Sequence, residues 1–251
     1  MTIAQLVLLG LFGFVGGVGI TALGPGGVIP TIGLFTLTGL SAAEVAGTAM
    51  VTYVAAAIVG AAVYVRSGQL RDPDTRRTGL LLAGTAAVST PVGILANTAL
   101  SRRAFGVLLG VLVAVVAALM WYREHRRPAV SATHPSVPVV VGLGLVVAAV
   151  SATFGIGGPM LTVPLLIALG MPLLPSLAAA QAQSVVIAGV GSLGYLAAHA
   201  VNWPLAVLVG IPELAGVLLG WKIAHALPSR LLKNTLIVTL LALAPYLALR
   251  G

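Results

Sequence analysis

Two glycine-rich quartets interrupt apolar stretches of the chain at matching places. The first is Gly24-Pro25-Gly26-Gly27, and the second is Gly155-Ile156-Gly157-Gly158, which follows 131 positions later. A helix that begins after such a break presents backbone N–H groups without intrahelical partners, and these groups and the helix dipole favour an anion. Close helix packing through small residues is the alternative explanation. Because three glycines recur within four positions in both quartets, we favour an anion-binding site formed by two broken helices.

Hydroxyl and carboxamide side chains follow each quartet on a predicted helix. Thr48 and Thr52 share one face of the apolar segment 44–65, with Glu44 one turn before them. The apolar segment 177–199 carries a second polar group, which consists of Gln181, Gln183 and Ser184. These residues are candidates for the lining of a substrate cavity. Hydrogen bonds between helices, worth about 0.6 to 2 kcal/mol in membranes, explain them equally well, and both explanations remain open.

Glu213 is a carboxyl group in the middle of the apolar segment 204–225. A charge at that depth costs several kcal/mol unless it is paired, hydrated or neutralised, so we expect Glu213 to act in proton coupling or gating. A structural hydrogen bond from a neutral Glu is the alternative. Lys222 follows nine residues later, about 13 Å along a helix, and therefore cannot pair with Glu213 along the same helix.

The elements that position these residues are membrane helices. Hydrophobic residues make up 59% of the chain and charged residues 7%, whereas a soluble domain carries roughly a quarter charged residues. Apolar runs of about 18 or more residues predict membrane spans. We therefore predict an all-α integral membrane protein with 8–10 transmembrane segments. Ten apolar segments can be drawn, at 3–22, 26–40, 44–65, 78–99, 104–122, 137–154, 157–170, 177–199, 204–225 and 231–249.

Charge and residue usage argue against several other classes of protein. The formal charge of +8 is carried mostly by short loops, where basic residues orient a membrane protein, so we expect the lipid bilayer and not nucleic acid as a partner. The chain has no cysteine, and its four histidines show no ligand-like spacing, so we expect neither a metal site nor a cofactor. Because no nucleophile and base converge at depth, we expect no catalytic residues, and an intramembrane enzyme is a less favoured alternative.

The chain is an internal duplication. We predict a first half at 1–122, a basic linker at 123–136 and a second half at 137–251. Five segments per half would invert the second half, and basic residues would then gather on one side, ten against three. Fusing each short segment with its predecessor, to give eight spans, produces a weaker imbalance, so we favour inverted halves. At the offset of 131 the quartet glycines match each other, as do Gly13 and Gly144, Thr31 and Thr162, Gly60 and Gly191, Tyr64 and Tyr195, and Pro73 and Pro204.

The stretch after the second quartet, Pro159-Met160-Leu161-Thr162-Val163-Pro164-Leu165-Leu166, resembles the TauE/SafE family, also called the sulfite exporter family. Ala46-Gly47-Thr48-Ala49, Gly60 and Tyr64 in the first half resemble it too. One departure is Ala178-Ala179-Ala180, where the family has a Gly-Thr-Ser-like turn. A polar role there would then pass to the neighbouring polar group of segment 177–199.

The resemblance implies a secondary transporter in the bacterial plasma membrane that moves sulfite, short sulfonates or related small anions. Export is expected from the family alone, with the proton gradient or the substrate gradient as the driving force. The alternatives are a transporter of another small carboxylate or solute, and a membrane subunit without transport of its own. The pattern of residues predicts neither the anion nor the oligomeric state.

Overall fold

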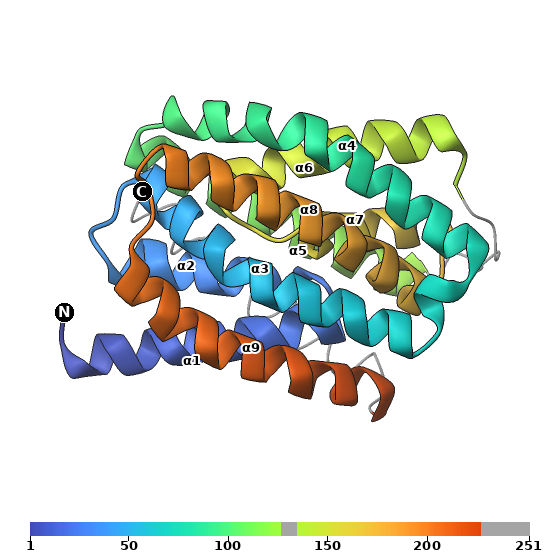
Figure 1. Ribbon diagram of the computed structural model, residues 1–251, viewed down its shortest axis with the longest axis horizontal. Coiled ribbons are helices and arrows are strands. Elements are labelled where there is room, and N and C mark those ends of the chain that lie inside the picture. Colours follow the sequence, from blue (N-terminus) through green and yellow to red (C-terminus); the bar gives the residue numbers. More distant parts are fainter. Residues whose placement is uncertain (127–134, 227–251) are drawn as a thin grey trace.

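The structure is a computed structural model that describes residues 1–126 and 135–226 (Figure 1). The described residues contain helices and no strands, which confirms the prediction of an all-α protein. The first part contains α1 (Ile3–Ala22), the 3-10 helix η1 (Pro25–Gly27), α2 (Val28–Leu37), α3 (Ala42–Arg66), the 3-10 helix η2 (Gln69–Arg71), α4 (Pro73–Thr98) and α5 (Arg102–Arg126). The second part contains α6 (Val137–Phe154), α7 (Pro159–Ala168), α8 (Leu173–Ala197) and α9 (Trp203–Ala226).

Seven of the described helices are long and apolar enough to cross a membrane: α1, α3, α4, α5, α6, α8 and α9. Their outward faces carry large apolar side chains such as Leu95 and Leu193, each 70% exposed, which suit hydrocarbon better than water. The chain is thus a multi-pass membrane protein. Two short predicted segments correspond to α2 and α7, and the predicted segment 231–249 lies outside the described residues.

α1 and α2 form a hairpin whose tip is the first glycine quartet. α2 runs back along α1, because Gly26 lies against Gly19 and Gly33 lies against Phe12. The ten residues of α2 cover about 15 Å, half of the roughly 30 Å hydrocarbon core. The helices end at the quartets as predicted, and the direction of the chain reverses there.

α6 and α7 are joined by the second quartet in the corresponding way. The hydroxyl of Tyr195 donates to the carbonyl oxygen of Ala152 at 2.8 Å, which places the last turns of α6 and α8 together. α7, which connects α6 to α8 in the chain, must therefore run in the opposite direction to both. α1 and α2 run in opposite directions, and so do α6 and α7, as in the ten-segment alternative and unlike the eight-span one.

The bounds of four helices agree with the offset of 131. At the offset of 131, α2 maps onto α7 and α3 maps onto α8, residue for residue at both ends. Tyr64, the counterpart of Tyr195, donates its hydroxyl to the carbonyl oxygen of Thr21 at 2.9 Å, and Thr21 is the counterpart of Ala152. Equivalent segments thus form equivalent tertiary hydrogen bonds.

Helices of one half pack against helices of the other half. α1 packs in parallel with α9, with Gly13 against Val209 and Gly17 against Glu213. α6 packs in parallel with α4 through Gly93 and Gly144, which lie against Ala149 and Thr85. These contacts place backbone against backbone or small side chains, as is common in membrane bundles.

The equivalent helices α3 and α8 lie side by side and antiparallel (Figure 1). Gly47, near the start of α3, contacts Tyr195 near the end of α8, whereas Gly60 contacts Gln181 near the start of α8. Two equivalent helices that run in opposite directions are the arrangement expected of inverted halves.

Local sequence explains where the helices begin. Thr2 and Gln5 form a capping box at α1, and Ser41 and Glu44 form one at α3. Glu44 therefore caps its own helix, with a carboxylate oxygen 2.8 Å from the N–H of Ser41, and does not share the surroundings of Thr52. Asp72 caps α4 by accepting from the N–H of Thr75 at 2.8 Å.

Arg102 has a structural role. From the sequence we attributed basic loop residues only to membrane orientation. Its guanidinium donates to the carbonyl oxygens of Phe35 at 2.7 Å and Thr38 at 2.9 Å, and also to that of Leu40. These groups lie at the C-terminal end of α2, where carbonyls lack helical partners and attract cations. The predicted linker 123–136 begins inside α5, which continues to Arg126, and residues 127–134 lie outside the described part.

Candidate functional site

The tips of the two hairpins meet inside the bundle. A Cβ atom added to Gly27 would lie 3.4 Å from the amide nitrogen of Gly157, and one added to Gly24 would meet Pro159 and Val163 of α7. Both quartets are buried. The structure therefore brings together the two breaks that lie 131 positions apart.

Three of the six candidate glycines are explained by backbone conformation or packing. Gly24 has φ of +97° and Gly155 has φ of +63°, in a region where a side chain is strained. Gly26 lies so close to Gly19 of α1 that an added Cβ would clash with that backbone. These three residues shape the hairpins and need no ligand to account for them.

Of the other three glycines, Gly27 and Gly157 are explained by neither cause, and Gly158 is partly explained by packing. Gly27 and Gly158 have right-handed helical dihedral angles, which any residue can adopt. A Cβ added to Gly157 would be 3.5 Å from its nearest neighbours, Pro159 and Ser184, which is an ordinary van der Waals distance. At Gly158 the nearest atom would be 3.2 Å away, at the end of the Ile187 side chain. Bare backbone at Gly27 and Gly157 is therefore not a requirement of the fold.

Both hairpin tips are held by the helix that follows them. Tyr53 of α3 donates its hydroxyl to the carbonyl oxygen of Gly27, and Ser184 of α8 accepts from the N–H of Gly158 at 3.0 Å. Tyr53 and Ser184 are counterparts at the offset of 131, as are Gly27 and Gly158. The sequence reasoning missed Tyr53, although the repeat offset from Ser184 would have found it.

The electrostatics at the hairpin tips favour negative charge. Gly27 and Gly158 precede α2 and α7, so two helix N-termini point into the same region. Neither helix has an acidic residue in its first turn. Within the described chain, the buried N–H of Gly157 also has no hydrogen-bond acceptor. Partial positive charge accumulates there without a protein anion to balance it.

The two candidate glutamines differ in their surroundings. Gln183 accepts from the hydroxyl of Thr162 at 2.5 Å and donates to the carbonyl oxygen of Gly144, so it joins α6, α7 and α8. Gln181 is fully buried against Gly60, and neither its oxygen nor its nitrogen has a hydrogen-bond partner among the described residues. A buried carboxamide without partners is costly and marks a position that a ligand could satisfy.

The candidate threonines form no hydrogen bond with either quartet. Thr48 accepts from the backbone N–H of Asn202 at 3.0 Å and so holds the connection between α8 and α9. Thr52 donates to the carbonyl oxygen of Ala49 at 2.8 Å and packs against Gly210 of α9. The structure thus engages Thr48 in a loop contact, and the α3 side chain that bonds to a hairpin tip is Tyr53, next to Thr52 in the sequence.

Glu213 is fully buried in the middle of α9. Within the described chain neither carboxyl oxygen has a hydrogen-bond partner, because the hydroxyl of nearby Thr52 is turned to its own helix. Tyr53 is the second polar neighbour on α3. α1, which packs on the other side, contains no titratable side chain. Glu213 therefore adjoins the residue that holds the first hairpin tip.

No group of three or more His, Cys, Asp or Glu residues that could hold a metal ion is present in the described residues. The arrangement offers backbone donors and one free carboxamide. It suits the binding of a small anion.

Comparison with known proteins gives the chain a family. The model of the sulfite exporter TauE/SafE family matches residues 8–247, nearly the whole chain. The chain belongs to the TauE/SafE family. A curated relative, the probable membrane transporter protein YdhB of Bacillus subtilis (strain 168), is 25% identical over 239 residues, which cover 93% of this chain and 96% of the relative. No solved structure matches the chain.

Membership of the TauE/SafE family agrees with the fold. Apolar helices cross the membrane, and the chain is a membrane transporter. The family model covers both quartets, so the hairpin tips lie within the region that makes this chain a TauE/SafE protein.

Proposed function

We propose that the chain is a secondary transporter that exports small sulfur-containing anions, such as sulfite or short organosulfonates, by alternating access. The name of the family supports this substrate class. The chemistry of the hairpin tips supports it independently, because an oxyanion is the ligand that converging helix N-termini and free N–H groups attract.

The bare backbone at Gly27 and Gly157 carries the proposal. A side chain would fit at both positions, so packing does not account for the two glycines. A ligand whose oxygens must come within hydrogen-bonding distance of the backbone does account for them, because a Cβ would occupy its place. The anion would bind between the two tips and accept from the N–H of Gly157.

Electrostatics gives this position its charge preference. Each helix N-terminus carries the equivalent of roughly half a positive charge, and α2 and α7 direct two of them at one region. The two positive helix ends repel each other, and an anion bound between them would be attracted to both. The unpaired carboxamide of Gln181, one turn before Ser184 on α8, would supply a further donor for the substrate.

The duplication supports alternating access. The quartets are buried, so an anion reaches them only when a hairpin moves relative to α3 or α8. The antiparallel pair α3 and α8 supports inverted halves. In inverted halves, an exchange of conformation between the two halves opens the same site to the opposite side of the membrane.

Glu213 would couple transport to protons. Its carboxyl group has no partner in the described structure and lies beside Tyr53, which holds the carbonyl of Gly27. A change in the charge of Glu213 would act on the Tyr53–Gly27 contact over a short distance. At the offset of 131 the corresponding position of the first half is Leu82, so this carboxyl group belongs to one half only.

Flux measurements test the proposal. The full chain would be reconstituted into liposomes, and the flux of sulfite, methanesulfonate and sulfoacetate would be compared with that of acetate. We expect saturable flux of at least one sulfur-containing anion. Flux of acetate alone would support a carboxylate transporter, since helix N-termini bind carboxylates as well. Absence of flux for every sulfur-containing anion, from protein shown to be folded, would overturn the substrate class.

A further inference from the structure

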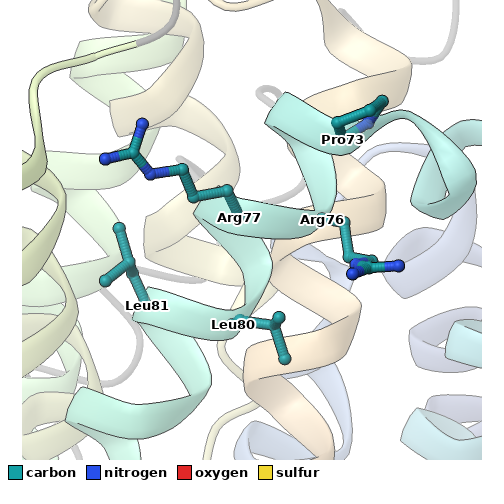
Figure 2. Close-up of a pocket in the computed structure, with 5 residues that line it drawn as sticks. All are labelled: Pro73, Arg76, Arg77, Leu80 and Leu81. Carbon is teal, nitrogen blue, oxygen red and sulfur yellow. The ribbon is translucent and has the colours of Figure 1, made fainter.

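A shallow pocket of about 320 Å³ lies at the start of α4, on the outside of the bundle. Figure 2 shows its five lining residues, with the two arginine side chains extending away from the helix in different directions. The pocket is separate from the hairpin tips. Its lining consists of Pro73, Arg76, Arg77, Leu80 and Leu81.

The two arginines have no hydrogen-bond or ion-pair partner among the described residues. Arg76 and Arg77 are exposed, and neither forms a hydrogen bond or an ion pair with a described residue. Arg102, by contrast, is held by three carbonyl groups at the end of α2. Cations near the N-terminus of a helix oppose its dipole, so the stability of α4 does not explain the two arginines.

The surrounding charge is positive. The stretch from Arg66 to Arg77 contains four arginines and two aspartates, and Asp72 is engaged as the cap of α4. Trp221 of α9 packs against the buried cluster that contains Tyr64 and Leu70, which places the exposed Lys222 at this same end of the bundle. Such an excess of basic residues marks the side of a membrane protein that faces anionic lipids.

An apolar track continues from the pocket along the lipid-facing side of α4. Leu80, Val88, Val92 and Leu95 are 63%, 69%, 59% and 70% exposed, and they follow one another at helical spacing. Exposed Gly84 lies between Leu80 and Val88, and a Cβ there would meet nothing within 4 Å. The track is therefore indented about two turns below the arginines, where a hydrocarbon chain could lie.

We propose that this pocket binds an anionic phospholipid. The phosphate group contacts Arg76 and Arg77, and one acyl chain lies along α4 over Gly84. Charge complementarity selects an anionic headgroup over a zwitterionic one, and the apolar track selects a lipid over a free phosphate ion. Orientation of the chain by positive loops explains the number of arginines at this end, but not their pairing with an indented apolar track.

Native mass spectrometry of the full chain, purified in detergent, tests the proposal. Phosphatidylglycerol and phosphatidylcholine would be added separately, and the retained lipid would be counted. We expect preferential retention of phosphatidylglycerol, falling about fivefold for each arginine removed in R76Q and R76Q/R77Q. R103Q, which removes an exposed arginine near the opposite end of α4, should retain the preference.

A second variant separates the lipid from a bare anion. Gly84→Leu fills the indentation without touching the arginines, so it should reduce retention of phosphatidylglycerol while the protein stays folded. Equal retention of both lipids, an unchanged preference in R76Q/R77Q, or displacement of the lipid by excess inorganic phosphate would overturn the proposal.

Discussion

Tyr53 and Ser184 hold the two glycine quartets from equivalent positions of α3 and α8. The hydroxyl of Tyr53 donates to the carbonyl of Gly27, and the hydroxyl of Ser184 accepts from the N–H of Gly158. The two contacts differ in polarity, because one engages a carbonyl and the other an amide. The hairpin tips are thus connected to the helices α3 and α8, which contact each other across the halves.

Tyr53→Phe should reduce transport more than it reduces stability. The change removes one buried hydrogen bond, worth about 1 kcal/mol, but it frees the Gly27 carbonyl at the proposed site. Tyr64→Phe and Tyr195→Phe are matched controls, since each removes an equivalent bond from a buried tyrosine to a carbonyl away from the quartets. Liposome flux and thermal unfolding would be measured together. Equal flux in all three variants would show that Tyr53 is structural.

Gly157→Ala should abolish transport without unfolding the protein. The added methyl group fits at ordinary contact distance but occupies the space beside the free N–H. Loss of hydrogen bonds to a charged ligand, about 1.5 to 3 kcal/mol each, predicts a fall of roughly 10- to 100-fold in substrate affinity. Isothermal titration with the transported anion would measure it.

Gly26→Ala is the matched comparison in the other quartet. Here the methyl group would clash with the backbone of Gly19, and overpacking of this kind costs about 1 to 3 kcal/mol of stability. Gly26→Ala should therefore lower the unfolding temperature, and Gly157→Ala should not. Normal substrate affinity in a folded Gly157→Ala protein would contradict the assignment of the bare glycine to substrate binding.

The repeat could be read from the sequence because matching helices require matching glycines, tyrosines and apolar lengths. The offset of 131 predicts the bounds of α7 and α8 from those of α2 and α3. For the direction of the chain after each quartet, the sequence left two alternatives, ten alternating segments or eight spans, and favoured the first only through the distribution of basic residues. Glycine marks an interruption of a helix, whereas the direction of the next helix depends on its packing against α1 or α6.

The other features that the sequence did not predict depend on contacts between residues far apart in the chain. Thr48 receives a hydrogen bond from Asn202, and nothing near Thr48 in the sequence indicates that contact. Gly26 and Gly27 are adjacent glycines. Packing against α1 requires glycine at Gly26 but not at Gly27, and only the distances to other segments show this. Composition and spacing identify candidates, and the surroundings of each residue decide among them.

Glu213→Gln should uncouple transport from the proton gradient. The amide preserves the size of the side chain but cannot release a proton, so a pH difference should no longer drive accumulation of the substrate. Exchange of substrate down its own gradient should continue. Uptake into liposomes with and without an imposed pH difference would measure both. Glu44→Gln is the control, because glutamine still completes the capping box at α3 and Glu44 lies outside the proposed site. Accumulation by Glu213→Gln at the rate of the unaltered protein would remove Glu213 from coupling.

Gln181→Met should stabilise the protein and impair transport. Gln181 lies against Gly60, and its counterpart Met50 lies against Gly191, so the chain itself shows that methionine fits this type of contact. The change removes a buried carboxamide without partners, which should raise the free energy of unfolding by about 1 to 3 kcal/mol. If the carboxamide contacts the substrate, affinity should fall although stability rises, and a residue used only for packing would not give these opposite effects. Thermal unfolding and substrate titration on the same preparation would measure both. A stabilised variant with unchanged affinity would remove Gln181 from the site.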